Sequence, residues 1–543
     1  MSPNNEKLLS SGFNDYYSIR KFLDSLIAEV QQFAENQRIL IKKLTEIGIA
    51  LSAEKNLDRL LEMIVDEACK FTHADAGTLY IISDDESELN FAIVQNNSLS
   101  LRMGGTGEKI TWPSIKLKDA GGNANIANVS AYVAISGEPV NIADVYDAGG
   151  FNFEGTKEFD HNTGYRSQSM LVVPLRNHEN DIIGVLQLLN ALDPATGKVI
   201  SFSPEYQEMV LSLASQAAIA LSNNRLIFDL ENLLESFVRT IATAIDEKSP
   251  YTGGHVRRVT ELTMTMARKI NNIKYGKFAG TQLSDDQLRE LRIAAWLHDV
   301  GKITTPEYVI DKATKLEAVH DRIHDVKTRM ELIKKDYLSK IIKNAHDAKI
   351  AAKIEELDED YQFLVEANSG SEFLDDDKIV RIKEIAKHKW NNNGKSYPLL
   401  SDEEVYHLCI RSGTLTKEER SIVNNHVLVT QKILSHLPFP KKMRHVADYA
   451  AAHHEKLDGT GYPLGLKGDQ LSLQSRIIAI ADIFEALTAK DRPYKRGKSV
   501  AQALKIMDRM AKNKHIDAEL YDLFVKEKVY EEYVKNNSVP HDD

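Results

Sequence analysis

The feature of this sequence that most constrains its fold is the uneven distribution of its histidines. Only three of the seventeen precede residue 250, and the later ones include two doublets, His298-Asp299 and His453-His454, each after an apolar stretch. Asp482 lies within another apolar segment, RIIAIADIFEALT. A polar or charged group on an apolar helix is costly to bury unless an opposite charge compensates it, and a metal ion can do so. The C-terminal half is therefore expected to fold around a metal centre.

The length and composition indicate a multidomain globular protein. A chain of 543 residues exceeds one hydrophobic core, so two or three domains are expected. No apolar run approaches the ~20 residues of a membrane-spanning helix, and the first residues lack the apolar segment of a signal peptide. Cys69 and Cys409 match no ligand or redox spacing, which favours packed thiols in a reducing compartment. The expected location is the cytoplasm.

The net charge of −11 argues against duplex nucleic acid as a partner. Affinity for its phosphates comes from clustered Lys and Arg, which this composition does not favour. A small anionic ligand stays compatible with the sequence, because a metal site supplies positive charge locally.

The N-terminal part predicts an α+β domain. Apolar residues recur at three- and four-residue steps over 16–48 and 56–72, and helical periodicity returns over 204–226. Between these helices, the region 103–165 is rich in Gly and Asn and is typical of pocket loops with one or two short helices. Short β-rich runs bounded by turn residues predict the strands AGTLYIISD, ELNFAIVQ, SMLVVPLRN and DIIGVLQLLN.

A helix is expected to continue from residue 226 to the Ser249-Pro250 breaker. Its apolar residues fall at three- and four-residue steps, and such a seam can join two subunits in a parallel coiled coil. The prediction is a homodimer, and the alternative is a single helix packed on its own domain. The seam consists of Leu226, Leu230, Leu233, Phe237 and Ile241.

After residue 250 the sequence predicts helices almost throughout. The stretch 311–410 mixes acidic and basic residues and favours solvated helices and loops inserted between two chemical motifs. This insertion would cap the site, contact the N-terminal domain, or be simple decoration.

Six short motifs after residue 250 carry the chemistry. An aspartate can bridge two cations, whereas an imidazole binds one, so an aspartate among histidines is suited to a two-metal site. A single histidine on a helix is more often an ordinary surface or core residue, and Lys302 or Arg492 alone could be a surface charge. The doublets together favour metal binding. The motifs are GGHVRRV, WLHDVGKI, NNHV, AAHHEKLDGTGYP, IAIADIFEALT and DRPYKR.

The segments HDVGK, GTLTKEER with NNH, HHEKLDGTGYP and ADIFEALTAKDRPY together resemble the HD-GYP phosphodiesterases of the HD superfamily. The resemblance covers about 250–310 and 411–515. It implies an all-α domain that hydrolyses cyclic di-GMP to pGpG, with or without onward cleavage to GMP. Simple HD phosphohydrolases share only part of the motif set, and the additional His426 and His453-His454 imply a second metal.

The resemblance also implies a role for each matched residue. The implied metal ligands are His255, His298, Asp299, His426, His453, His454 and Asp482. Asp299 would bridge the metals, and His298, Asp299 and Lys302 would form the catalytic group. The implied substrate contacts are Lys302, Arg492 and Lys495 at the phosphates, and Asp458, Gly461, Tyr462 and Pro463 in a loop over the substrate, where a structural role for the turn is the alternative.

The metal content follows from one departure and from the ligand types. Some family members place a Glu four residues before the first histidine to hold a third metal, and this chain has Tyr251 there. A phenol substitutes poorly for a carboxylate, so two divalent ions are expected. Ligands without thiolate permit iron or manganese, and the resemblance implies iron before manganese.

The segments EPVNIADVYDAGGFN, TGYRSQSMLVVPLRN and DIIGVLQLLNA resemble GAF domains over about 40–225. GAF domains that bind cyclic nucleotides often carry Asn-Lys, then Phe, then Asp-Glu. This chain has Asn190-Ala191, Phe202 and Tyr206-Gln207 at those positions, so three of the five differ. A cyclic-nucleotide effector, another small-molecule effector and a purely dimerising GAF domain all stay open.

The expected architecture is an α+β GAF sensor domain with an antiparallel sheet, a helical linker and an all-α HD-type domain. The predicted parts are a helical segment at 1–39, the sensor at 40–225, the linker at 226–249 and the catalytic domain at 250–543 with its insertion at 311–410. Sensor occupancy would act on the site through the linker. Two other functions are considered, namely hydrolysis of another cyclic dinucleotide such as cyclic GMP-AMP, and a non-catalytic signalling module.

Overall fold

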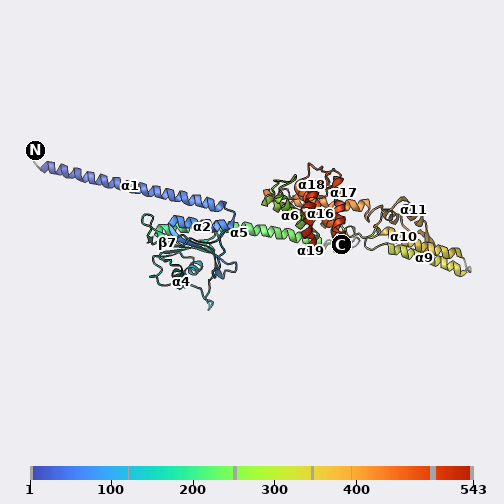
Figure 1. The fold of residues 1–543 in the computed structure, drawn as a ribbon, viewed down its shortest axis with the longest axis horizontal. Helices are drawn as coiled ribbons and strands as arrows, with labels where there is room; N and C mark the ends of the chain where they lie inside the picture. The colour runs from blue at the N-terminus through green and yellow to red at the C-terminus, as the bar shows by residue number, and fades with distance from the viewer. Residues whose placement is uncertain are drawn as a thin grey trace. The chain divides into compact units, whose positions relative to one another are not determined.

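The computed structural model describes residues 4–119, 121–248, 254–343, 348–392, 394–489 and 497–537 (Figure 1). The chain forms two compact units, which divide between Asn232 and Leu233. None of the described helices combines the length and the apolar character needed to span a bilayer.

The first unit is built on one antiparallel sheet, as the sequence predicts. Its main path runs β3-β2-β1-β7-β6-β5, with β4 paired to β2 and β8 paired to β7. In the central strands, Leu79 lies opposite Ile93 on one side and Leu186 on the other. The strands are β1 (Ala74–Ile82), β2 (Glu88–Asn96), β3 (Leu101–Gly104), β4 (Ile115–Lys116), β5 (Val140–Ile142), β6 (Met170–Arg176), β7 (Ile182–Leu192) and β8 (Val199–Ile200).

The sheet is covered on both faces, which explains why β6 and β7 are nearly continuous apolar runs. In β6, Leu171 and Val173 join the core formed with helices α2 and α5. The alternating residues Met170 and Val172 join a second core that includes Val133 of α3. The helices are α1 (Asn4–Ala53), α2 (Leu57–Thr72), α3 (Val129–Ser136), α4 (Glu154–Thr163) and α5 (Pro204–Asp246).

Helix α5 runs unbroken through the expected linker region. Its last turns pack in the second unit, where Val238 and Ile245 are buried in the core. The preceding apolar residues are exposed, from 57% at Leu226 to 67% at Leu230. Packing within the second unit therefore explains the last turns of α5, whereas the exposed apolar seam lies before these turns.

The second unit is helical, and its core joins segments that are distant in sequence. Val259, Leu291, Phe484 and Phe524 share one cluster. Its helices are α6 (His255–Asn272), α7 (Asp285–Leu297), η1 (Val300–Thr304), α8 (Glu307–Ile310), α9 (Ile323–Lys343), α10 (Ala348–Asn368), α11 (Asp376–Ile385), α12 (Asp402–Leu408), α13 (Lys417–Asn424), α14 (His426–Ser435), η2 (Lys441–Met443), α15 (Val446–Ala451), α16 (Leu473–Thr488), α17 (Val500–Lys512), α18 (Ala518–Lys526) and α19 (Val529–Asn537).

The insertion has a hydrophobic core of its own, which includes Val326, Leu364 and Ile382. Its helices α9 and α10 lie side by side (Figure 1). The insertion was expected to consist of helices and loops, but β9 (Lys389–Asn392) and β10 (Lys395–Pro398) form an antiparallel hairpin there. These strands, KWNN and KSYP, are mostly exposed polar residues, so they lack the apolar alternation that predicts a strand.

The insertion is anchored beside the predicted metal ligands. The Nζ of buried Lys312 donates to both carboxylate oxygens of Glu419, at 2.6 and 2.9 Å. Glu419 also completes the capping box of α13 with Thr416. Because α13 leads directly into α14, which begins at His426, the start of the insertion is fixed to the segment that carries this histidine.

Candidate metal centre

The seven predicted metal ligands come together in the second unit. His255 begins α6, the pair His298-Asp299 ends α7, and His426 begins α14. His453-His454 follow α15, and Asp482 lies on α16. All except His454, which is partly exposed, are buried. Helix ends therefore place most of these side chains, which lets short segments from several helices converge on one point.

A glycine explains how two of these segments approach so closely. A Cβ added at Gly301 would lie 1.9 Å from the carbonyl oxygen of His426. The Gly301 amide donates to Thr430 Oγ1 at 2.9 Å, and this hydroxyl donates to the carbonyl of His298 at 3.2 Å. The HDVGK turn therefore packs directly on the first turn of α14.

Three of the histidines share one local device. In each, Nδ1 lies 2.5–2.7 Å from the carbonyl oxygen three residues earlier, which can only accept a hydrogen bond. Nδ1 therefore carries the hydrogen and Nε2 carries the lone pair. These buried Nε2 atoms have no hydrogen-bond partner among the described residues, which is the arrangement that a cation would satisfy. The histidines are His298, His426 and His453, with the carbonyls of Ala295, Val423 and Ala450.

Asp299 lies between two groups of histidines. Its Oδ2 is 3.4 Å from Nε2 of His255 and 3.2 Å from Nε2 of His298. Its Oδ1 is 3.3 Å from Nε2 of His426 and 4.0 Å from Nε2 of His453. The two oxygens of one carboxylate therefore face two different pairs of imidazoles, as a bridging ligand would.

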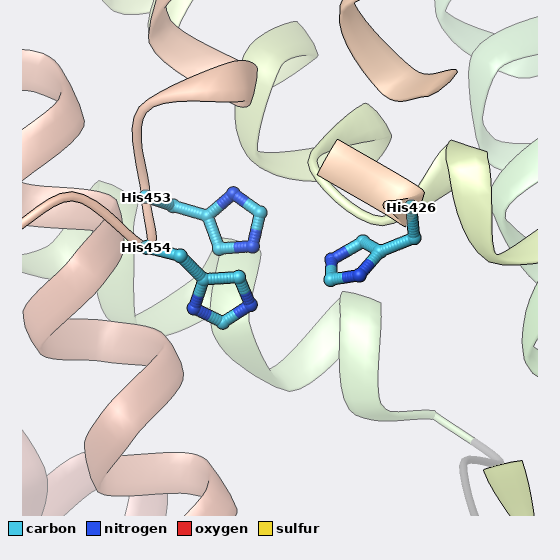
Figure 2. A group of neighbouring side chains, drawn as sticks. All are labelled: His426, His453 and His454. Carbon is cyan, nitrogen blue, oxygen red and sulfur yellow. The ribbon is translucent and has the colours of Figure 1, made fainter. Parts of the chain in front are cut away.

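Two clusters of potential ligand atoms flank this carboxylate. The first consists of His255, His298 and Asp299, and the second of His426, His453 and His454. Within each cluster the candidate atoms lie within 4.8 Å of one another. Figure 2 shows the rings of His453 and His454 lying across a common space from the ring of His426. The residues present therefore fit two divalent cations.

Glu485 belongs to the centre and is not assigned by the sequence analysis. It is fully buried on α16, and its carboxylate accepts hydrogen bonds from Nδ1 of His255 and, at 2.7 Å, from Nε of Arg258. Asp482, one turn earlier, has Oδ1 3.3 Å from Nε2 of His255. The sequence signal that could have identified Glu485 is its three-residue spacing from Asp482, because residues three apart lie on the same face of a helix.

The electrostatics of the centre suit cation binding. Burial opposes ionisation of Asp299, but Lys302, whose Nζ lies 2.5 Å from Oδ2, holds the pKa of this carboxyl well below its usual range. Burial and the neighbouring His454 hold the pKa of His453 well below its ordinary value, which keeps the imidazole neutral. Burial opposes the charge on His255, but the carboxylates led by Glu485 raise its pKa well above the ordinary value. That local excess of negative charge is what a cation would neutralise.

The loop that contains Gly461-Tyr462-Pro463 is fixed by a second buried glutamate. Glu455 accepts hydrogen bonds from the amides of Leu464 at 2.6 Å, Gly465 at 3.1 Å and Leu466 at 2.9 Å. The Tyr462 ring lies 4.9 Å from the His454 ring, so the loop borders the centre. The sequence pattern predicted no role for Glu455.

The remaining predicted site residues fall into three groups: one in an exposed turn, one beside the centre, and three outside the described residues. Asp458 is exposed and accepts from the amide and hydroxyl of Thr460, which closes a local turn. Lys302 is 27% exposed beside the centre. The predicted phosphate contacts Arg492 and Lys495, and Tyr251 at the third-metal position, lie outside the described residues.

The first unit contains a cavity of about 700 Å³ against its sheet. Its wall includes Tyr80, Phe91, Trp112 and Phe159, whose neighbouring rings lie 4.8–6.0 Å apart. Asn190, compared above with a cyclic-nucleotide motif, instead holds the backbone through hydrogen bonds to Arg166 and Gln168. Asn190 thus serves local structure, and none of the five motif positions lines the cavity.

Comparisons with known proteins agree with this division of the chain. Two family models described as HD domain match residues 252–383 and 401–520, and one described as GAF domain matches 56–221. A 3'3'-cGAMP-specific phosphodiesterase of Vibrio cholerae is 28% identical over 51% of this chain and 35% of its own length. A cyclic di-GMP phosphodiesterase of Pseudomonas aeruginosa is 39% identical over 21% of this chain and 27% of its own.

A cyclic di-GMP phosphodiesterase of Thermotoga maritima is 34% identical over 22% of this chain and 32% of its own length. The chain thus spans about a third of the length of the curated relatives that it matches. The matched segments contain all seven residues of the metal centre. The chain therefore joins an N-terminal GAF domain to a C-terminal HD domain, and the relatives that it matches are named as cyclic dinucleotide phosphodiesterases.

Proposed function

We propose that the second unit is a metal-dependent phosphodiesterase that hydrolyses cyclic di-GMP to pGpG, with or without further cleavage to GMP. The observation that carries the proposal is the position of Asp299, whose two oxygens face two different histidine pairs. The curated names of two relatives supply the substrate.

Two divalent cations are proposed in this centre, on the seven residues described above. When bound, they would generate a hydroxide near neutral pH and neutralise charge on the phosphoryl oxygens. Imidazole and carboxylate ligands without thiolate suit iron or manganese, and iron is our first choice. The third-metal carboxylate of some relatives is replaced by Tyr251, so we propose two ions rather than three.

The chain's own groups would orient the substrate around this centre. The fixed tautomers of His298, His426 and His453 point their lone pairs inward without reorganisation during the reaction. The Lys302 ammonium, partly exposed beside Asp299, is placed to offset charge on a phosphate. We propose the same role for Arg492 and Lys495. The ordered loop around Tyr462 would cover the substrate and exclude water.

Hydrolysis of 3'3'-cGAMP is a second candidate supported by a specific observation. The relative that matches 51% of this chain carries that substrate in its name. Rates with cyclic di-GMP, 3'3'-cGAMP and cyclic di-AMP, measured on the same metal-loaded preparation, decide between the two readings. A faster rate with 3'3'-cGAMP would replace our first choice.

The test of catalysis combines metal analysis with site variants. His298→Ala and Asp299→Ala should abolish hydrolysis by the iron- or manganese-loaded protein. His436→Ala is a matched control, because its Nδ1 also contacts a backbone carbonyl but the side chain is exposed. Persistent activity in the two site variants would contradict the proposal. Less than one metal per chain after anaerobic purification would favour a non-catalytic signalling module.

We further propose that residues 40–225 sense an effector and that 226–249 relay its occupancy in a homodimer. The cavity of the GAF domain would hold the small molecule, and the exposed seam around Leu230 would pair with a second copy. Leu230→Glu should shift the molar mass measured by light scattering from dimer toward monomer, whereas the same change at exposed Val319 should not. A monomeric wild-type protein would exclude this arrangement.

A further inference from the structure

The second unit, which carries the HD domain, contains a polar pocket away from the metal centre. It has a volume of about 690 Å³, which is within the range of small-molecule sites. The end of α5, one face of α6, the middle of α7 and the last helix α19 surround it. None of the seven metal-centre residues lines it.

The pocket and the metal centre use opposite faces of the same helix. His255 starts α6 and points to Asp299, whereas Arg257 and Arg268 line the pocket. At 3.6 residues per turn, Arg257 is rotated by about 200° and Arg268 by about 220° from His255. A ligand in the pocket would therefore lie behind α6 and would not touch the metal ligands.

The pocket is basic in a protein of net charge −11. Its wall holds four arginines, Arg239, Arg257, Arg268 and Arg292, against two glutamates. The positive charge is only partly compensated, because among the described residues Arg239 and Arg292 share one carboxylate, that of Glu235, at 3.6 and 3.3 Å. A cluster with this excess of positive charge favours an anion.

The individual arginines are available to a ligand. Arg257 pairs with Glu261 at 2.6 Å, but both side chains are about half exposed, and such a pair is weak and exchangeable. Arg268 is exposed and makes no hydrogen bond or ion pair with any described residue. Guanidinium groups bind phosphate oxygens through two parallel hydrogen bonds, which makes these side chains suited to a phosphorylated ligand.

An aromatic ring in the pocket indicates which group the ligand would carry besides phosphate. Trp296 lines the same pocket and is partly buried, and the Arg239 guanidinium lies over it with its carbon 6.0 Å from the ring centroid. Indole and guanidinium planes are the surfaces on which nucleobases stack. We propose that this pocket is a second, non-catalytic nucleotide site, which binds phosphate on Arg257 and Arg268 and a base near Trp296 and Arg239.

The site is tested by titrating full-length, metal-free protein with GMP in a calorimeter, so that the metal centre contributes no phosphate binding. Arg268→Ala should weaken the GMP affinity by about tenfold or more, as the loss of a charged hydrogen-bond donor predicts. Arg268→Lys keeps the charge and should recover part of the affinity. Arg509→Ala, an exposed arginine outside the pocket, and His298→Ala in the metal centre should leave it unchanged.

Other probes separate the alternatives. Inorganic phosphate should bind more weakly than GMP, because it cannot stack on Trp296, and rising salt should weaken both. GMP binding that is absent, or equal in wild type and Arg268→Ala, overturns the proposal. If phosphate binds as tightly as GMP, the pocket is an anion site and the proposed base contact is wrong. An acidic peptide that binds while GMP does not would replace the nucleotide with a protein partner. Hydrolysis is measured separately on metal-loaded protein, so failure of either proposal leaves the other testable.

Discussion

Glu485 accepts the Nδ1 hydrogen of His255 from one helical turn beyond Asp482, so α16 contributes both a candidate ligand and the group that orients another. The same carboxylate accepts from Arg258, which fixes its own position. Buried partners of this kind set the tautomer of a ligating histidine and raise its basicity. Glu485 is therefore a positioning residue, and it differs from the partners of His298, His426 and His453, which are backbone carbonyls that no substitution removes.

The first prediction concerns metal affinity. Glu485→Gln should lower affinity for the ion held by His255 by roughly 10–100-fold, because the amide is a weaker partner for the imidazole. Titration with manganese, followed by metal counting after gel filtration, measures the change. The ion on the His426 side should be retained, and Glu261→Gln on the exposed face of α6 is the control. Equal loss of both ions would contradict a role confined to His255.

The second prediction separates loop order from metal binding. Glu455→Gln should leave the metal content unchanged but weaken the anchoring of Leu464, Gly465 and Leu466, since hydrogen bonds to a charged acceptor are lost. We expect KM to rise and kcat/KM to fall by about tenfold, which is the effect expected from the loss of one hydrogen bond to a charged group. Steady-state kinetics with cyclic di-GMP measure this. A loss of metal would instead show that Glu455 supports the centre itself.

The third prediction tests the close packing at the HDVGK turn. Gly301→Ala places a Cβ against the His426 carbonyl, which belongs to the backbone and cannot turn aside. Overpacking of this kind costs about 1–3 kcal/mol, and the movement should also lower metal affinity. Thermal unfolding with and without manganese measures both effects. Gly149→Ala is the control, because its added Cβ meets no atom within 4 Å. An unshifted melting temperature would show that the turn can move.

The sequence singled out the seven residues that the fold brings together, and it could do so for a physical reason. Metal chemistry demands particular residue types, and the His298-Asp299 and His453-His454 doublets would be costly to bury beside apolar helices without a cation to bind. The antiparallel sheet could also be predicted from the sequence, because strands buried on both faces leave long apolar runs such as that of β6. In both cases a local pattern carries the information.

Features that depend on contacts between distant segments left little local signal, such as the three-residue spacing between Asp482 and Glu485. Glu485 and Glu455 are ordinary helix and loop residues until the fold buries them beside His255 and the Tyr462 loop. The arginine pocket joins residues from Arg239 to Asn536, and no spacing connects them. The hairpin β9–β10 escaped prediction because its strands are polar, with the Trp390–Tyr397 ring contact at 5.3 Å as its main apolar feature.

The fourth prediction concerns Lys315 in the insertion, which is fully buried. Its ammonium donates to the carbonyl of Leu408 at 3.1 Å and forms no ion pair with a described carboxylate. Burial lowers the pKa of Lys315 to about 8 from an ordinary value of 10.5. Between these values the unfolded chain holds a proton that the folded chain has released, so stability rises with pH in this window.

Lys315→Met should remove that pH dependence. The stability of the wild type relative to the variant should rise by roughly 3 kcal/mol between pH 8 and 10.5, at about 1.4 kcal/mol per pKa unit. Urea unfolding at both pH values, followed through the part of the tryptophan fluorescence change that is lost when Trp390 is replaced by Phe, measures this difference. Comparison with the variant cancels the tyrosines and other groups that titrate in the same range. Parallel curves for the two proteins would mean that Lys315 stays protonated in the folded insertion, held by the Leu408 carbonyl against the cost of burial.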